Sequence, residues 1–136
     1  MFDHLDLPVR DFAASVAFYR IALAPLGIEQ TSEDPPEFGA LSFIAQSSPQ
    51  ALHFSFIAET SAAVRAFHRA GIGAGYRSNG EPGVRQYAWD YYAAYLLDPD
   101  GHNVEAVHRS AETRATWNWL GIGMVSPSTR PSRTPP

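Results

Sequence analysis

Two stretches of the chain match each other at a fixed separation of 49 residues, with no gap. Each begins with a short alternation of apolar and polar residues, which predicts a half-buried strand. Each continues into a segment whose apolar residues recur at helical spacing. Identical residues at this offset include His4 and His53, Ala13 and Ala62, Ala14 and Ala63, Phe18 and Phe67, and Arg20 and Arg69. The repeat predicts two copies of one strand–helix–strands unit.

The segments between the repeated parts predict further strands and loops. Residues 28–34 and 40–46 are expected to be strands, with residues 35–39, which hold two prolines and a glycine, as a turn between them. Residues 73–86 are rich in glycine, with proline and arginine, and predict a long loop. Residues 86–97 are strand-like.

A tight hairpin is predicted near the end of the second unit. Asp98-Pro99-Asp100-Gly101 has proline at the second and glycine at the fourth position of a type I turn. The strand after it, "NVEAV" (103–107), contains a carboxylate, Glu105, among apolar residues. Such a carboxylate either lies on a solvated face or binds something.

The repeat bears on this question because pseudo-twofold symmetry brings equivalent residues face to face. His4 and His53 both lie on the strand face opposite the predicted helix, and the hairpin register points Glu105 toward the same space. Two imidazoles and one carboxylate suit Fe(II), Mn(II), Zn(II), Ni(II) or Co(II), and leave coordination positions for a substrate. The alternative is that the histidines are ordinary polar strand residues and Glu105 is solvated. The pattern alone leaves both open.

Composition excludes several classes of function. There is no Cys and no Lys, which removes thiolate ligands, disulfides, Schiff-base lysines and the P-loop lysine. A net charge of -4 with scattered arginines argues against a nucleic-acid partner. The sequence has neither a signal peptide nor an apolar run of the ~20 residues that a membrane span needs. We therefore expect a cytoplasmic protein without a membrane partner.

The chain resembles a known superfamily over residues 2–109. An opening strand with His4, the helix "DFAASVAFYRIALAPLG", the strand "LHFSF" and the closing "YLLDPDGHNVEAV" are similar to the vicinal oxygen chelate superfamily. That superfamily groups glyoxalase I, bleomycin-resistance proteins, extradiol dioxygenases and fosfomycin-resistance enzymes. The resemblance implies an α+β fold of paired βαβββ modules, whose curved half-barrel sheets surround a metal and substrate cavity.

The resemblance also implies site residues and a function. It places metal ligands at His4, His53 and Glu105, with Glu105 also catalytic, and it implies a homodimer acting on a small oxygen-bearing molecule by lyase, isomerase or dioxygenase chemistry. Glyoxalase I has one more ligand, a glutamate near the end of its first module. The corresponding strand here, "GALSFIAQ", has no carboxylate, and Glu37 precedes it in the predicted turn. Glyoxalase I activity itself is therefore not expected.

Three residues are expected to contact the substrate. Tyr92 and Trp89 belong to an aromatic-rich strand that can line an apolar pocket, and Arg85 can bind an anionic group. We expect one domain over residues 1–109, with modules at about 1–50 and 51–109, and a tail, partly rich in proline and serine, over residues 110–136. The alternative function is non-catalytic binding of a small molecule, as in bleomycin-resistance proteins.

Overall fold

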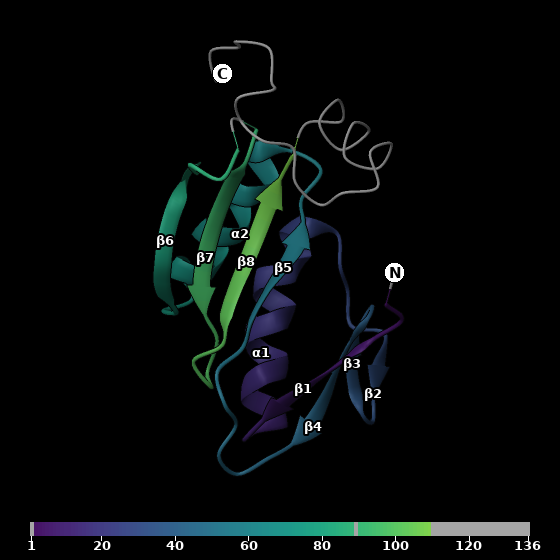
Figure 1. Ribbon diagram of the computed structural model, residues 1–136. Helices are drawn as coiled ribbons and strands as arrows, with labels where there is room; N and C mark the ends of the chain where they lie inside the picture. The colour runs from purple at the N-terminus through teal and green to yellow at the C-terminus, as the bar shows by residue number, and fades with distance from the viewer. Residues whose placement is uncertain (1, 89, 110–136) are drawn as a thin grey trace.

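The computed structural model describes residues 2–88 and 90–109, and the expected tail over 110–136 lies outside them. Two modules with the same order of elements follow each other along the chain (Figure 1). The first consists of β1 (Leu5–Val9), α1 (Phe12–Leu23), a short 3-10 helix η1 (Ala24–Leu26), β2 (Ser32–Glu33), β3 (Pro36–Phe38) and β4 (Leu41–Ala45). The second consists of β5 (His53–Ile57), α2 (Ser61–Gly73), β6 (Arg77–Val84), β7 (Tyr92–Leu97) and β8 (Asn103–His108).

Both modules build the same sheet. The strand orders are β1-β4-β3-β2 and β5-β8-β7-β6, so the first and last strands of each module are neighbours. These two neighbours pair in parallel, and the remaining pairs are antiparallel. The expected α+β fold of paired βαβββ modules is confirmed. The two sheets are not closed into barrels.

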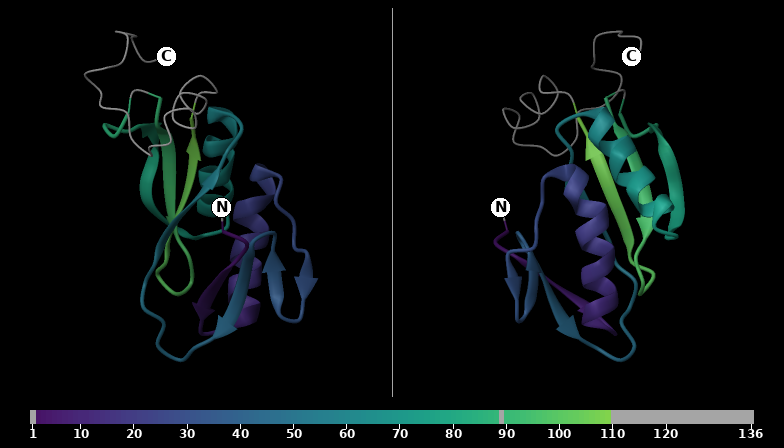
Figure 2. Two further views of the ribbon diagram at one scale, coloured as in Figure 1. Left: turned by 45° about the vertical axis from the view of Figure 1, so that its right-hand side comes forward. Right: turned by 180° about the vertical axis from the view of Figure 1, so that it is seen from behind.

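The helices lie together behind the sheets, α1 beside α2 (Figure 2). Side chains that begin each helix satisfy its free backbone N–H groups: Asp11 accepts from Ala14 N at 3.2 Å, and Thr60 accepts from Ala63 N at 3.0 Å. The core lies between helices and sheets, where Phe18, Tyr19 and Phe67 are fully buried. The opposite sheet faces therefore remain available for a site. In the described residues, no helix has the length and apolar character to cross a membrane.

Two segments that were predicted as a loop and a turn contain strands instead. Residues 73–86 contain β6, which lies at the edge of its sheet and pairs with β7 through two register irregularities. An edge strand tolerates Pro82, and glycine permits the close approach of β7, because a Cβ on Gly80 would lie 2.6 Å from Tyr95 Cδ2. Residues 36–38, predicted as part of a turn, form β3 because Gly39, at φ +61, allows a tight turn into β4.

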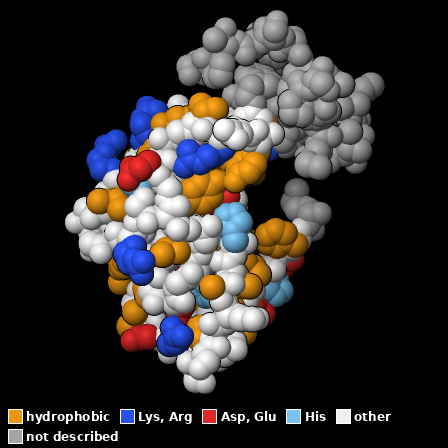
Figure 3. Space-filling view, turned by 60° about the vertical axis from the view of Figure 1, so that its left-hand side comes forward, with side chains coloured by type: hydrophobic (Ala, Val, Ile, Leu, Met, Phe, Trp, Pro, Cys, Tyr) orange, Lys and Arg blue, Asp and Glu red, His pale blue; other side chains and the backbone are white. Residues whose placement is uncertain are grey.

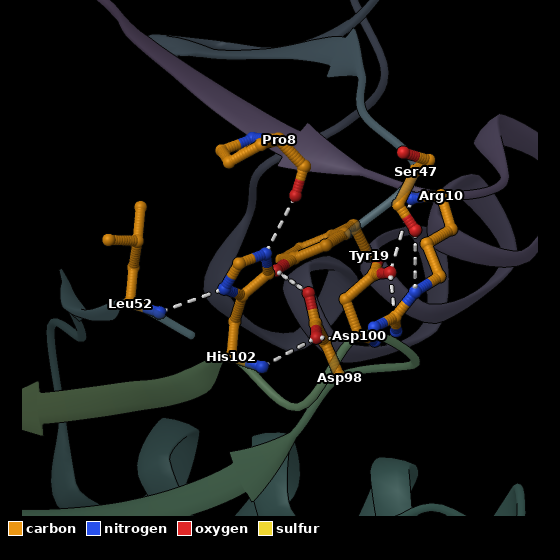
Figure 4. A network of polar contacts seen from close by, with 8 residues as sticks. All are labelled: Pro8, Arg10, Tyr19, Ser47, Leu52, Asp98, Asp100 and His102. Carbon is orange, nitrogen blue, oxygen red and sulfur yellow. Dashed lines mark hydrogen bonds and ion pairs between the residues drawn. The ribbon is translucent and has the colours of Figure 1, made fainter. Parts of the chain in front are cut away.

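The predicted hairpin turn over residues 98–101 is present, and it joins the two modules (Figure 4). Asp98 Oδ1 accepts hydrogen bonds from the backbone N–H groups of Asp100 and His102, both at 2.9 Å. Its other oxygen accepts from the Tyr19 hydroxyl of α1 at 2.7 Å. Burial raises the pKa of Asp98, and the Tyr19 hydrogen bond partly opposes this rise.

His102 completes this connection with both ring nitrogens. Nδ1 accepts from the Leu52 N–H at 2.9 Å, so it carries no proton, and Nε2–H donates to the Pro8 carbonyl at 2.8 Å. The imidazole is therefore neutral and joins β1 to the segment that leads into β5. We refer to Tyr19, Asp98 and His102 with their partners Pro8 and Leu52 as the module joint.

Candidate metal and substrate site

Glu105, on β8, is a buried carboxylate with a full set of partners. It is 1% exposed, yet it lies on the sheet face away from α2. Ser55 Oγ donates to its Oε2 at 2.5 Å, and the Tyr91 hydroxyl donates to its Oε1. A buried carboxylate is stable only when donors or cations surround it. Around Glu105 the partners are the two hydroxyl donors, Ser55 and Tyr91, and one histidine.

That histidine is His53, and its two nitrogens have different surroundings. Nδ1 lies 3.1 Å from the Asn103 carbonyl, which can only accept, so Nδ1 carries the proton. Nε2 lies 3.1 Å from Glu105 Oε2. A bare nitrogen lone pair facing a carboxylate is repulsive, so this pair needs a second proton or a metal ion at Nε2. An imidazole that donates through one nitrogen and presents the other is typical of metal-binding histidines.

Two tyrosines border Glu105. Burial and the hydrogen bond to Glu105 raise the pKa of Tyr91 well above its usual value. Burial and the Glu105 charge raise the pKa of Tyr95 to about 12. Both phenols are therefore neutral donors at physiological pH. Tyr95 also packs against His53, with ring centroids 6.1 Å apart, and under the Arg85 guanidinium, 5.2 Å from its ring centroid.

His4 belongs to a separate cleft in the first module. Nδ1 is 2.9 Å from Asp3 Oδ2, and Nε2 is 4.0 Å from Asp6 Oδ1. These carboxylates raise its pKa, with the hydrogen bond to Asp3 as the largest cause. The cleft is lined by first-module residues, among them Glu37 and Ser42. His4, like His53, thus has Nδ1 held by an oxygen and Nε2 directed elsewhere.

One chain does not bring the three predicted ligands into a single cluster. Among the described residues, the one set of three His, Asp or Glu side chains with ligand atoms within 4.8 Å of one another is Asp98, Asp100 and His102. Hydrogen bonds already use both nitrogens of His102 and both oxygens of Asp98. That set is therefore part of the module joint and not a metal site.

Two of the residues predicted to contact the substrate, Arg85 and Tyr92, lie on different sides of the second sheet. Arg85 lies beside the site, over Tyr95, and donates to the Glu81 carbonyl at 2.5 Å. Tyr92 points to the helix side of the sheet, where its hydroxyl accepts from Arg65 of α2 at 3.4 Å. Trp89 lies outside the described residues.

Sequence reasoning missed the two hydroxyl donors to Glu105. Ser55 shares its strand face with His53, two residues away, and this alternation was a usable signal. Tyr91 precedes β7, yet alternation puts it on the same face as Tyr95, and both tyrosines border Glu105, so this signal was also usable.

The surface around the second sheet is mixed in character. In the space-filling view that brings the β6 side forward, imidazoles reach the surface next to apolar side chains, and the arginines are spread out (Figure 3). On β5, His53 has a side chain 52% exposed, and Ile57 is 67% exposed. The face that carries His53 is thus open.

Comparison with known proteins decides the family. The model of the "Glyoxalase/Bleomycin resistance protein/Dioxygenase superfamily" matches residues 1–106. The chain belongs to this superfamily. A solved structure of a glyoxalase/bleomycin resistance protein from Albidiferax ferrireducens T118 is 32% identical to this superfamily member, with a TM-score of 0.66, covering 81% of this chain and 99% of that one.

Two further structures share the fold at lower identity. Lactoylglutathione lyase from Agrobacterium tumefaciens is 21% identical with a TM-score of 0.61, covering 79% of this chain and 92% of its own. Oxidase ChaP-H2 is 20% identical with a TM-score of 0.62, covering 81% of this chain and 94% of its own. No curated protein matches the chain. This architecture thus occurs in one protein named a lyase and in another named an oxidase.

Proposed function

We propose that this superfamily member is a metal-dependent enzyme whose divalent ion is held by His4, His53 and Glu105. The observation that carries the proposal is the contact between His53 Nε2 and Glu105 Oε2 at 3.1 Å, because this pair needs a second proton or a metal ion at Nε2. The donor set suits Fe(II), Mn(II), Zn(II), Ni(II) or Co(II). When bound, the ion would act as a Lewis acid on a substrate that presents adjacent oxygen atoms.

The surrounding residues would position the ligands and receive the substrate. Ser55 and Tyr91 hold the carboxylate of Glu105, and the Asn103 carbonyl orients His53. Tyr95 offers a neutral phenol for a substrate oxygen, and Arg85 brings a positive charge above its ring. This combination favours a small oxygenated substrate with lyase, isomerase or dioxygenase chemistry. The fold neighbours that are a lyase and an oxidase support this range.

We also propose that two copies of the chain complete the site. Within one chain His4 lies in a cleft of the first module, whereas His53 and Glu105 lie on the open face of the second. A twofold dimer would place the first-module cleft of one copy against the second-module face of the other. The exposed apolar residue Ile57, beside His53 on β5, fits a covered interface.

Metal binding tests the ligand assignment. Metal-free protein titrated with Mn(II), Ni(II) and Zn(II) by calorimetry should bind, and His53→Ala should bind more weakly by about tenfold or more, since it removes a proposed ligand. His108→Ala is the control, because His108 lies in the same sheet but bonds the Ala58 carbonyl. Equal affinity of wild type and His53→Ala would refute the ligand set.

The reaction type has its own assay. Protein reconstituted anaerobically with Fe(II) should be assayed for oxygen uptake with catechols, in parallel with lactoyl-thioester formation from methylglyoxal and a thiol. Oxygen uptake would assign dioxygenase chemistry and thioester formation lyase chemistry. Protein that binds no metal yet retains small ligands would instead be a binding protein of the bleomycin-resistance type.

A further inference from the structure

Three side chains of the second module gather between α2 and β6, on the side of the sheet opposite Glu105. His68 of α2 is 7% exposed, and its Nε2 lies 2.8 Å from the hydroxyl oxygen of Ser78 on β6. Its Nδ1 lies 3.9 Å from Oε2 of Glu81, also on β6. A hydroxyl at one ring nitrogen and a carboxylate at the other are the arrangement of a serine nucleophile, its base and the acid that orients the base.

A β-bulge in β6 brings Ser78 and Glu81 to the same side of the sheet. Ser78 pairs with Leu96 of β7 and Gly80 pairs with Tyr95, so two steps along β6 correspond to one step along β7. The extra residue reverses the alternation of faces, and Gly80 lies against the Tyr95 ring. Glu81 therefore returns to the α2 side, although residues three apart in a regular strand lie on opposite faces.

The hydrogen bonds around Ser78 assign the protons of His68. The Gly80 N–H donates to Ser78 Oγ at 3.3 Å, so the hydroxyl proton is free to be donated to His68 Nε2. Nε2 is then the acceptor, and Nδ1–H faces Glu81. Ser78 is exposed, so a substrate can reach it. The Gly80 N–H is also within reach of an oxyanion that forms on an acyl group attached to Oγ.

The cleft beside these residues indicates the kind of substrate. His68 and Glu81 line it together with Arg65, Arg69 and Ile72. Arg65 lies over an aromatic ring, whereas Arg69 has no hydrogen-bond or ion-pair partner in the described part of the chain. A guanidinium without a partner attracts a carboxylate or another anionic group. The cleft therefore fits a small ester that carries a negative charge.

We propose that Ser78 is the nucleophile of a second, metal-independent active site that hydrolyses small anionic esters. Ser78 Oγ bonds to the acyl carbon, the bond from that carbon to the leaving oxygen breaks, and the Oγ proton passes through His68 Nε2 to the leaving alcohol. Water then attacks the acyl carbon and gives a proton to Nε2. The bond to Oγ breaks, Oγ regains the proton, and the carboxylic acid leaves. Glu81 is a positioning residue that orients His68.

Covalent labelling of the full-length, metal-free protein tests this site independently of the proposed metal ion. Diisopropyl fluorophosphate should give one adduct, in which a P–O bond to Ser78 replaces the P–F bond and the hydroxyl proton leaves with fluoride. Peptide mapping by mass spectrometry locates the adduct. Ser78→Ala should not be labelled, and Ser48→Ala, which removes an exposed serine between β4 and β5, should be labelled as the wild type is. Wild-type protein without label at Ser78 would overturn the proposal.

Two further positions separate catalysis from a merely structural link between β6 and α2. His68→Gln should slow the labelling of Ser78 by about 100-fold, because it removes the base. The Glu81 side chain is 80% exposed, so Glu81→Gln leaves the packing intact. It should slow labelling by a smaller factor, and Glu81→Asp should restore part of the rate because it restores a carboxylate. Labelling of Glu81→Gln at the wild-type rate would refute the role of Glu81 and with it the proposed site.

A pair of chromogenic esters tests the substrate class. 3-Acetoxy-4-nitrobenzoate carries a carboxylate that o-nitrophenyl acetate lacks, so the metal-free protein should hydrolyse it faster by about tenfold or more, relative to the rates without protein. Arg69→Gln should remove this preference and leave the rate with the neutral ester unchanged. Equal rates of the wild type with the two esters, or a preference that persists in Arg69→Gln, would overturn the assignment of an anionic substrate.

Discussion

At the scale of single residues, the partners of a buried acid decide what it does. Asp98 and Glu105 are both almost fully buried. Asp98 has its oxygens occupied by two backbone N–H groups and the Tyr19 hydroxyl, so it is structural. Glu105 accepts from Ser55 and also faces His53 Nε2, which leaves a place for a cation. Two carboxylates of nearly equal burial thus have different surroundings, backbone N–H groups around Asp98 and an imidazole beside Glu105.

The Tyr19 hydroxyl should stabilise the fold in a pH-dependent way. Tyr19→Phe removes a donor to a buried carboxylate, which should cost about 1.5–3 kcal/mol of unfolding free energy near neutral pH. The pKa of Asp98 is already raised by burial, and loss of this hydrogen bond raises it further. As pH falls through that pKa the carboxyl becomes neutral in the folded state, so the cost of the substitution should shrink toward acid pH.

Urea denaturation of wild type and Tyr19→Phe at about pH 7 and about pH 5 measures this effect. Tyr76→Phe is the control, because Tyr76 packs edge-on against Phe18 and its hydroxyl makes no hydrogen bond with the described residues. A Tyr19→Phe cost that stays constant or grows on acidification would contradict the assignment.

At the scale of elements, regular alternation could be predicted and irregular strands could not. β5 alternates in exposure, whereas β8 is buried from Val104 to Val107, and Glu105 of β8 lies opposite Ser55 of β5. β6 was predicted as a loop because its Gly80, Pro82 and Gly83 are turn residues by propensity. Pairing with β7 overrides that propensity. Residue propensities alone therefore do not predict a strand at the edge of a sheet that forms through pairing with its neighbour. Glu37 was predicted in a turn for the same reason, since the pairing of β3 with β4 depends on tertiary contacts.

Close packing of β6 on β7 should make Gly80 intolerant of a side chain. In Gly80→Ala the new Cβ would meet the Tyr95 ring at 2.6 Å, so strand or ring must shift. We expect a loss of about 1–3 kcal/mol in unfolding free energy, the usual cost of overpacking. In Gly83→Ala the nearest atom is the end of the flexible Arg85 side chain, at 3.2 Å, so the loss should be smaller. Thermal denaturation compares the two, and equal losses would refute the role of Tyr95.

At the scale of the whole molecule, the repeat predicted the architecture better than it predicted the site. Both modules have the expected sheet order, and His4 lies just before β1, whereas His53, 49 residues later, begins β5. What the pattern could not predict is how the modules lie relative to each other. The module joint sets that arrangement, and it leaves His4 in a separate cleft from Glu105.

A site shared between two copies predicts complementation. His4→Ala and His53→Ala should each lose metal binding when pure, whereas a mixture in which subunits exchange should regain about a quarter of the sites, because each mixed dimer has one intact site. Calorimetry on the mixture gives the number of sites, and light scattering gives the mass of the assembly. A monomeric protein, or a mixture without recovery, would show that one chain forms its own site.

The module joint has a consequence for how relatives of this chain are to be compared. The segment from Asp98 to His102 holds β1, α1 and β5 together through Pro8, Tyr19 and Leu52. The residues of the joint therefore serve the arrangement of the two modules, and proteins with different reactions can have this arrangement in common. Ser42, which pairs with Asp6, and Glu105, which pairs with Ser55, lie outside the joint, so a substitution at either position leaves the contacts of the joint intact. Agreement between two proteins in the joint therefore indicates a shared arrangement of the modules and says nothing of the reaction.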